Sequence, residues 1–169
     1  FHRAAASPSR KPMSAPPRLF DRDLLRARLD RAAPGYAAAD FLKARAAEDA
    51  VVRLEAIMRD FPRAVDLGAR NGWFARFLSQ SDAAERVGFL VEADLSPRML
   101  AGRQGLRLVA DEERLPFAAG SLDLVVSTLA LHWTNDVVGA LIQIRRALKP
   151  DGLFIGSLLG GATLTELRQ

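Results

Sequence analysis

The amino-acid sequence predicts one α/β domain with a parallel sheet, preceded by helices. After Pro62, short apolar runs alternate with stretches of helical periodicity, a pattern typical of parallel strands joined by crossover helices. The run Leu124–Val126 is apolar at every position, which indicates a strand covered by helices on both faces. Glycines and acidic residues follow several of these runs, so a ligand site is expected at the carboxyl edge of the sheet.

Five strands and three crossover helices are expected in this second part of the chain. The strands are predicted near residues 64–67, 87–93, 106–110, 122–128 and 153–158, and the helices near residues 72–80, 97–103 and 137–148. Residues 149–152, with the sequence Lys-Pro-Asp-Gly, have the composition of a turn.

Two helices are expected before the sheet. The first covers residues 21–33 and ends at Pro34-Gly35. The second covers residues 37–59 and is stopped by Phe61-Pro62. Its apolar face is predicted to consist of Phe41, Leu42, Val51, Val52, Leu54 and Ile57. The chain therefore divides into an extension (1–18), N-terminal helices (19–62) and the sheet-containing core (63–169).

The extension has basic residues, alanine, serine and proline but no acid, which is the composition of a mitochondrial transit peptide. Its four prolines disrupt the amphipathic helix that such a peptide needs, so the sequence favours a disordered extension. The expected compartment is the cytoplasm, with the mitochondrial matrix as the alternative if residues 1–18 are a targeting segment.

Composition excludes several classes of function. The chain has 169 residues and no cysteine, which rules out disulfides and thiolate metal sites, and its two histidines are too few for a metal cluster. No apolar run is long enough to form a transmembrane segment. The net charge of +4 comes from residues 1–60, so the core offers no basic stripe and nucleic acid is not an expected partner.

The first candidate site lies where the first core strand ends. Asp66 is followed by Gly68, Ala69 and Gly72, and a helix then begins. Glycine lets a backbone approach a ligand closely, and the start of a helix presents free N–H groups to it. A plain structural turn would have the same composition, so this segment alone does not decide between the two interpretations.

The second candidate is Asp94, at the end of the second strand and about 20 residues beyond the glycines. A carboxylate at this place can accept hydrogen bonds from both hydroxyls of a ribose. Glu92 is a rival for this role. Asp94 could also cap the helix that starts at Pro97, although Ser96 is better placed for capping.

Two further segments follow the third and fourth strands. Asp111 and Glu112 are expected beside a nucleotide base, with a solvated acidic loop as the alternative. Ser127 begins a segment that runs to Trp133 and is a candidate wall on the acceptor side of the site. His132 in this segment could act as a base, but a packed, structural histidine is the favoured interpretation.

Taken together, these segments resemble the ordered motifs of class I S-adenosylmethionine-dependent methyltransferases. The resemblance rests on the following segments: Val65–Gly68, Asp94–Ser96, Ala110–Glu112, Leu115–Phe117, Leu122–Ser127 and Leu148–Gly152. It implies a Rossmann-like sheet, truncated here after about five of seven strands and so incomplete at the C-terminus. Within this superfamily, Leu19–Arg22, Leu131–Asp136 and Gly160–Leu164 resemble the mitochondrial complex I assembly factor 5 and its bacterial methyltransferase relatives.

The resemblance also implies roles for individual residues. Asp66, Gly68, Ala69 and Gly72 would surround the methionine end of S-adenosylmethionine, with Ser127 close to them. Asp94 would hold the ribose, Leu95 would pack against the adenine, and Asp111 with Glu112 would flank it. Arg70 departs from the pattern, which usually has glycine there, and is expected either to crowd the cofactor or to pair with its carboxylate.

Three alternatives accompany the predicted methyl transfer to a small-molecule or protein acceptor. The complex I assembly factor is described as an arginine hydroxylase acting on a complex I subunit, so the resemblance also allows a cofactor-binding hydroxylase. A non-catalytic assembly factor is possible on the same grounds. An NAD-dependent oxidoreductase is disfavoured, because Gly68 and Gly72 do not fit the G-x-G-x-x-G spacing. No catalytic residue is assigned.

Overall fold

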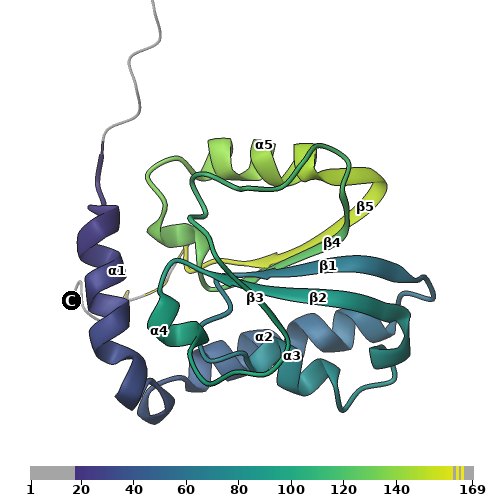
Figure 1. Ribbon diagram of the computed structural model, residues 1–169, viewed down its shortest axis with the longest axis horizontal. Helices are drawn as coiled ribbons and strands as arrows, with labels where there is room; N and C mark the ends of the chain where they lie inside the picture. The colour runs from purple at the N-terminus through teal and green to yellow at the C-terminus, as the bar shows by residue number, and fades with distance from the viewer. Residues whose placement is uncertain (1–17, 162, 164, 166–169) are drawn as a thin grey trace, which may run out of the picture.

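The computed structural model describes residues 18–161, 163 and 165 (Figure 1). Five parallel strands form one sheet in the order β3-β2-β1-β4-β5. Their bounds are β1 Phe61–Leu67, β2 Val87–Asp94, β3 Leu106–Val109, β4 Leu122–Thr128 and β5 Leu148–Ser157. The α/β fold class and the five predicted strands are therefore confirmed. The predicted extension lies outside the described residues except for Arg18.

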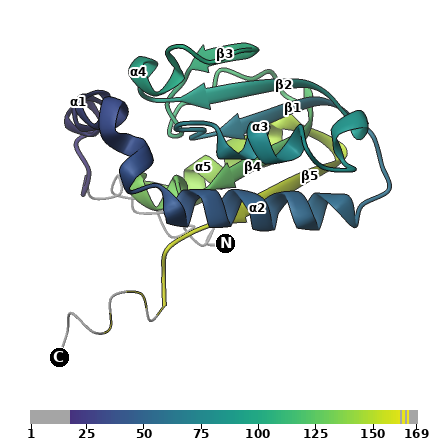
Figure 2. The same cartoon turned by 90° about the horizontal axis from the view of Figure 1, so that it is seen from below.

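The helices cover the sheet on both faces, as Figures 1 and 2 show. The α-helices are α1 Arg22–Ala32, α2 Phe41–Glu55, α3 Trp73–Leu78, α4 Pro97–Leu100 and α5 Val137–Ala147. Short 3₁₀ helices are η1 Ala33–Ala38, η2 Ala84–Arg86 and η3 Leu131–Trp133. Helices α2 and α3 pack on one face, and α5 packs on the other.

Apolar side chains that point alternately to the two sides of the central strands form the core on both faces of the sheet. In β4, Leu124 and Val126 belong to the cluster under α2 and α3, whereas Val125 belongs to the cluster under α5. Side chains of a strand alternate between its two faces, so a run that is apolar at every position fills both layers. The predicted two-sided burial of β4 is thus confirmed.

The buried face of α2 differs from the prediction. Phe41, Leu42 and Val52 are exposed, and the residues that are buried are Lys43, Ala47, Ala50, Val51 and Leu54. These five recur at helical spacing, so they form one continuous stripe. The predicted face was right for Val51, Leu54 and Ile57, which packs against the same core, and wrong for the other three. It followed the largest apolar side chains and passed over small alanines and a lysine.

The predicted turn at residues 149–152 lies within β5. Leu148 already pairs with Leu122, and the register then shifts before Leu153 pairs with Leu124. Asp151 takes up the irregularity with φ of 62°. The segment therefore bends the strand at its start and does not separate it from α5.

The order of the strands places a crevice at the end of β1. The chain runs from β1 outward to β2 and β3, then returns to the other side of β1 for β4 and β5. Ligands of open parallel sheets bind at such a switch point, outside the carboxyl ends of the strands. Helix α1 lies across this edge next to α4 (Figure 1).

Gly68 has little free space in the turn after β1. Its φ is +74°, and an added Cβ would clash with the methyl group of Ala130.

We expect Gly68→Ala to lower the free energy of unfolding by about 3 kcal/mol, because the strained backbone and the overpacking add up. Urea denaturation measures this. Gly35→Ala is the matched control, since Gly35 has open space around it. A Gly68→Ala midpoint equal to that of Gly35→Ala would contradict the expectation.

Candidate functional site

The predicted site residues meet at the carboxyl edge of the sheet. Asp66 lies near the end of β1, Asp94 ends β2, Glu112 follows β3, and Ser127 lies near the end of β4. All four are buried, with at most 1% of their surface exposed. Acidic side chains such as the first three are rarely buried without partners, so their contacts indicate what the site can hold.

The turn after β1 is held by backbone contacts to the neighbouring strand. The N–H groups of Gly68 and Ala69 both donate to the Ala93 carbonyl, at 2.8 and 3.0 Å. Gly72, with φ of +74°, caps the start of α3 and packs against Arg103. The turn is therefore a rigid part of the sheet edge.

Glu92, the rival to Asp94, also has an arginine partner. The Arg103 guanidinium donates to both Glu92 carboxylate oxygens and also to the Asn71 carbonyl. Through Arg103, Glu92 is thus linked to the glycine turn at Asn71. Asp94, at the end of β2, is paired in the same way with Arg70, so these contacts do not decide between the two acids.

Asp94 accepts hydrogen bonds from both neighbouring turns. Its Oδ1 accepts from the Ser96 N–H at 2.8 Å, and its Oδ2 accepts from the backbone N–H and from Nη1 of Arg70, both at 2.8 Å. The Ser96 hydroxyl accepts from the Met99 N–H, so Ser96 is the cap of α4, as predicted. Arg70 is almost fully buried and points back onto the Asp94 carboxylate.

Asp111 and Glu112 face a second arginine. Nη2 of Arg22, at the start of α1, contacts Asp111 Oδ1 at 2.6 Å and also Glu112 Oε2. Asp111 is partly exposed, whereas Glu112 is buried. The two acids that were predicted to flank an adenine are therefore bridged by one guanidinium from the N-terminal helix.

Lys43 is a site residue that the sequence reasoning missed. Its ammonium donates to the Gly68 carbonyl at 2.7 Å, to the Thr128 carbonyl at 2.5 Å and to the Thr128 hydroxyl at 2.7 Å. These hydrogen bonds link α2 to the ends of β1 and β4. Its place on the buried stripe with Ala47, Ala50, Val51 and Leu54 was a readable signal, because a lysine on an apolar face needs buried partners.

Asp66 has a buried carboxylate with unused acceptor capacity. Among the described residues, neither of its oxygens has a hydrogen-bond partner. Burial raises its pKa to about 6, although the nearby Lys43 opposes this rise. Burial likewise lowers the pKa of Lys43 to about 8, against the attraction of Asp66. A ligand ammonium group would supply the donors that this carboxylate lacks.

The remaining predicted residues have mainly packing contacts. The Ser127 hydroxyl donates to the Leu67 carbonyl at 2.9 Å and so supports the end of β1. Leu95 is buried next to Asp94. His132 lies against Trp133, and burial lowers its pKa, with Arg70 and Lys43 adding to the effect. A neutral, packed histidine agrees with the structural interpretation of His132.

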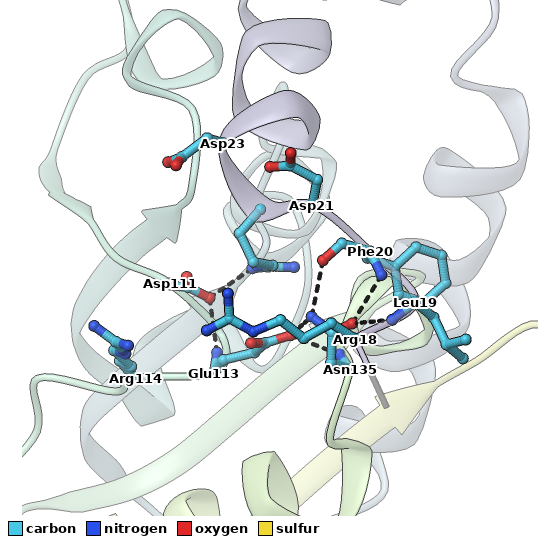
Figure 3. Close-up of a pocket in the computed structure, with 10 residues that line it drawn as sticks. Arg18, Leu19, Phe20, Asp21, Asp23, Asp111, Glu113, Arg114 and Asn135 are labelled. Carbon is cyan, nitrogen blue, oxygen red and sulfur yellow. Dashed lines mark hydrogen bonds and ion pairs between the residues drawn. The ribbon is translucent and has the colours of Figure 1, made fainter. Parts of the chain in front are cut away.

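Helix α1 is attached to the edge by polar contacts. Asn135 Oδ1 accepts from the Leu19 and Phe20 N–H groups, and Asp30 accepts from the Ser96 hydroxyl. Within the described chain, no residue of α1 is buried. A cavity of about 590 Å³ lies between the start of α1 and the loop after β3 (Figure 3). Its lining includes Asp111, together with Arg18, Asp23 and Arg114.

The raised pKa of Asp66 predicts a stability change with pH. Between its ordinary pKa of 3.8 and about 6, the folded state holds this proton more tightly than the unfolded state, so stability falls as pH rises through this window. We expect the free energy of unfolding of the wild type, relative to Asp66→Asn, to drop by roughly 2 kcal/mol between about pH 4 and pH 7.

Urea denaturation at both pH values measures this difference. Asp82→Asn, at an exposed position, is the control and should shift the comparison by less than about 0.5 kcal/mol. A flat or rising difference for Asp66→Asn would show that the buried carboxylate is not penalised in the folded state.

Comparisons with known proteins agree with this geometry. A family model described as a methyltransferase domain matches residues 65–156, more than half of the chain. The human mitochondrial arginine-hydroxylase NDUFAF5 is 42% identical over 157 residues, which cover 89% of this chain and 44% of that protein. The malonyl-[acyl-carrier protein] O-methyltransferase of Gallionella capsiferriformans is 35% identical over 165 residues, covering 89% and 56%. The chain thus spans about half the length of these curated relatives.

Solved structures give the same result. A Haloferax volcanii methyltransferase, solved with the Trm112 methyltransferase activator, aligns with a TM-score of 0.64 and 27% identity over 76% of this chain and 57% of its own. An S-adenosylmethionine-dependent methyltransferase from Mesorhizobium loti aligns with a TM-score of 0.52 and 33% identity, covering 66% and 53%. The fold, the ordered motifs and the matched family model together establish that the chain belongs to the S-adenosylmethionine-dependent methyltransferase family.

Proposed function

We propose that the chain binds S-adenosylmethionine at the carboxyl edge of the sheet and transfers its methyl group to a small-molecule or protein acceptor. The observation that carries the proposal is the pair of buried carboxylates on adjacent strands, Asp66 on β1 and Asp94 on β2, on either side of the Gly68 turn. Such a pair suits a ligand that has both an ammonium group and a ribose.

Each predicted residue has a place in this interpretation. Asp66 would accept from the cofactor ammonium, because its own oxygens lack donors among the described residues. Gly68, Ala69 and Gly72 would let the backbone approach the methionine end, with Ser127 supporting the turn from β4. Asp94 would hold the ribose. Leu95, Asp111 and Glu112 would surround the adenine.

Methyl transfer needs little acid–base help from the protein. The sulfonium of S-adenosylmethionine supplies an activated methyl group when it is bound. The protein's task is to exclude water and to align the acceptor with the methyl group, which can lower the barrier substantially. This agrees with a site that is rich in binding groups and in which we assign no catalytic residue.

Hydroxylation of a protein arginine is the second candidate. The observation in its favour is the 42% identity to a protein named as an arginine hydroxylase, against 35% for the malonyl-carrier methyltransferase. A complex I subunit would then be the acceptor or partner, and a non-catalytic assembly role would use the same surface.

The cellular compartment is a separate question. Four of the similar proteins are named as mitochondrial, which favours the mitochondrial matrix over the predicted cytoplasm. Among the described residues, no helix has the length and apolarity to cross a bilayer.

Calorimetric titration of the full-length protein with S-adenosylmethionine tests cofactor binding, with NAD as the control ligand. We expect Asp94→Asn to weaken binding at least tenfold, because the ribose loses a charged acceptor. His132→Ala and Asp82→Asn should bind within about twofold of the wild type, since neither side chain is assigned to the cofactor. Normal binding by a folded Asp94→Asn variant would show that the site is placed wrongly.

A labelled-methyl assay then separates the two reactions. We expect label from S-adenosylmethionine to appear on the acceptor, with a malonyl-carrier protein and an arginine-containing complex I subunit as the two substrates to compare. Cofactor binding without label on either acceptor, and with oxygen added to the arginine, would replace methyl transfer with hydroxylation.

A further inference from the structure

Arg70 occupies the position on Asp94 that the proposed ribose would need. It stands where the resemblance predicts glycine, and its φ of 52° is unusual for a residue with a side chain. Its backbone N–H and its Nη1 both reach the same carboxylate oxygen, Asp94 Oδ2. The side chain therefore folds back over its own amide and covers the carboxylate.

This contact leaves Asp94 closed to a ligand. The side chain of Asp94 is 0% exposed and that of Arg70 is 4% exposed. Oδ2 already accepts two hydrogen bonds, and Oδ1 accepts one from the Ser96 N–H. A ribose diol can reach this carboxylate only if the guanidinium leaves, while the two backbone donors can remain in place.

A second carboxylate lies within reach of the displaced guanidinium. Arg70 Nη1 is 4.0 Å from Glu112 Oε1. Arg22 already contacts the other oxygen, Oε2, so Oε1 faces Arg70. A buried arginine that lost its partner would be costly, but a shift from Asp94 to Glu112 keeps the charge paired throughout.

We propose that Arg70 sets the affinity of the site by competing with the ribose for Asp94, and that cofactor binding moves its guanidinium toward Glu112. This inference rests on the proposed cofactor binding. It adds that binding must include the free-energy cost of moving the Arg70 guanidinium away from Asp94. The opposite role, in which Arg70 holds the cofactor's carboxylate, would require the side chain to point away from the carboxylate that it now covers.

Two ligands distinguish these roles. S-adenosylmethionine carries the ribose and the carboxylate, whereas 5′-methylthioadenosine carries the ribose and lacks the carboxylate. Competition for Asp94 predicts that Arg70→Gly binds both ligands at least tenfold more tightly than the wild type does. Glycine suits the positive φ, so the backbone of the turn is retained. Arg70→Gln, which keeps the length without the charge, should shift both ligands in the same direction and replaces the glycine variant if that one unfolds.

Arg59→Gly is the matched control. Arg59 is exposed in the loop before β1, at the opposite end of the strand from the site, and its loss should leave both dissociation constants unchanged. Calorimetry at one ionic strength gives all the constants, and thermal unfolding checks that each variant is folded.

The outcomes are separable. Weaker S-adenosylmethionine binding by Arg70→Gly, with methylthioadenosine unchanged, would overturn the proposal in favour of carboxylate capture. Equal constants in wild type and variant would overturn it as well, while leaving cofactor binding intact. If neither ligand bound to any folded variant, cofactor binding itself would be wrong. Binding that appeared only in Arg70→Gly would support the competition most strongly.

Discussion

The structure depends on the pairing of buried charges at the carboxyl edge of the sheet. Asp66, Asp94 and Glu112 are acids from the edge of the sheet that are almost fully removed from water. Arg70 contacts Asp94 and Arg22 contacts Glu112, while Lys43 is near enough to Asp66 to affect its pKa without contacting it. Burial of an unpaired charge is costly, so each acid requires a cation close by. Two of the three cations come from the N-terminal helices, and this requirement explains why those helices lie against the site.

The same pairing links stability to function. Replacing buried ion pairs with apolar side chains is often neutral or stabilising, so this cluster is weak evidence for a purely structural role. Asp66 is the clearest case, because its oxygens have no hydrogen-bond partners among the described residues and its pKa is raised to about 6. Under the proposed function, this unpaired carboxylate would accept from the ammonium group of the cofactor.

The two N-terminal α-helices, α1 and α2, differ in the kind of contacts that attach them to the sheet. Helix α2 contributes a stripe of small side chains to the core, together with the ammonium of Lys43. Helix α1 has no fully buried residue and is attached by polar contacts through Asn135, Arg22 and Asp30, with Phe20 packed edge-on against Trp133 at its start. The contact of Arg22 with the buried Glu112 is the strongest of these attachments, because loss of Arg22 would leave a buried carboxylate without its cation. The site therefore combines the sheet and α2 with a helix, α1, that is held mainly through this charge pair.

The sequence by itself determined the sheet, its two-sided burial and the positions of the Gly68 turn, Asp94 and Asp111, because strand periodicity and turn chemistry act between near neighbours. It also marked Arg70 as unusual. Only the tertiary structure decided what the cations contact: Lys43 reaches Thr128, 85 residues away, and Arg22 reaches Glu112, 90 residues away. The partly wrong prediction of the buried face of α2 has the same origin. Which side of a helix is buried, and which acid an arginine meets, depend on the packing of distant segments, and no local pattern encodes that packing.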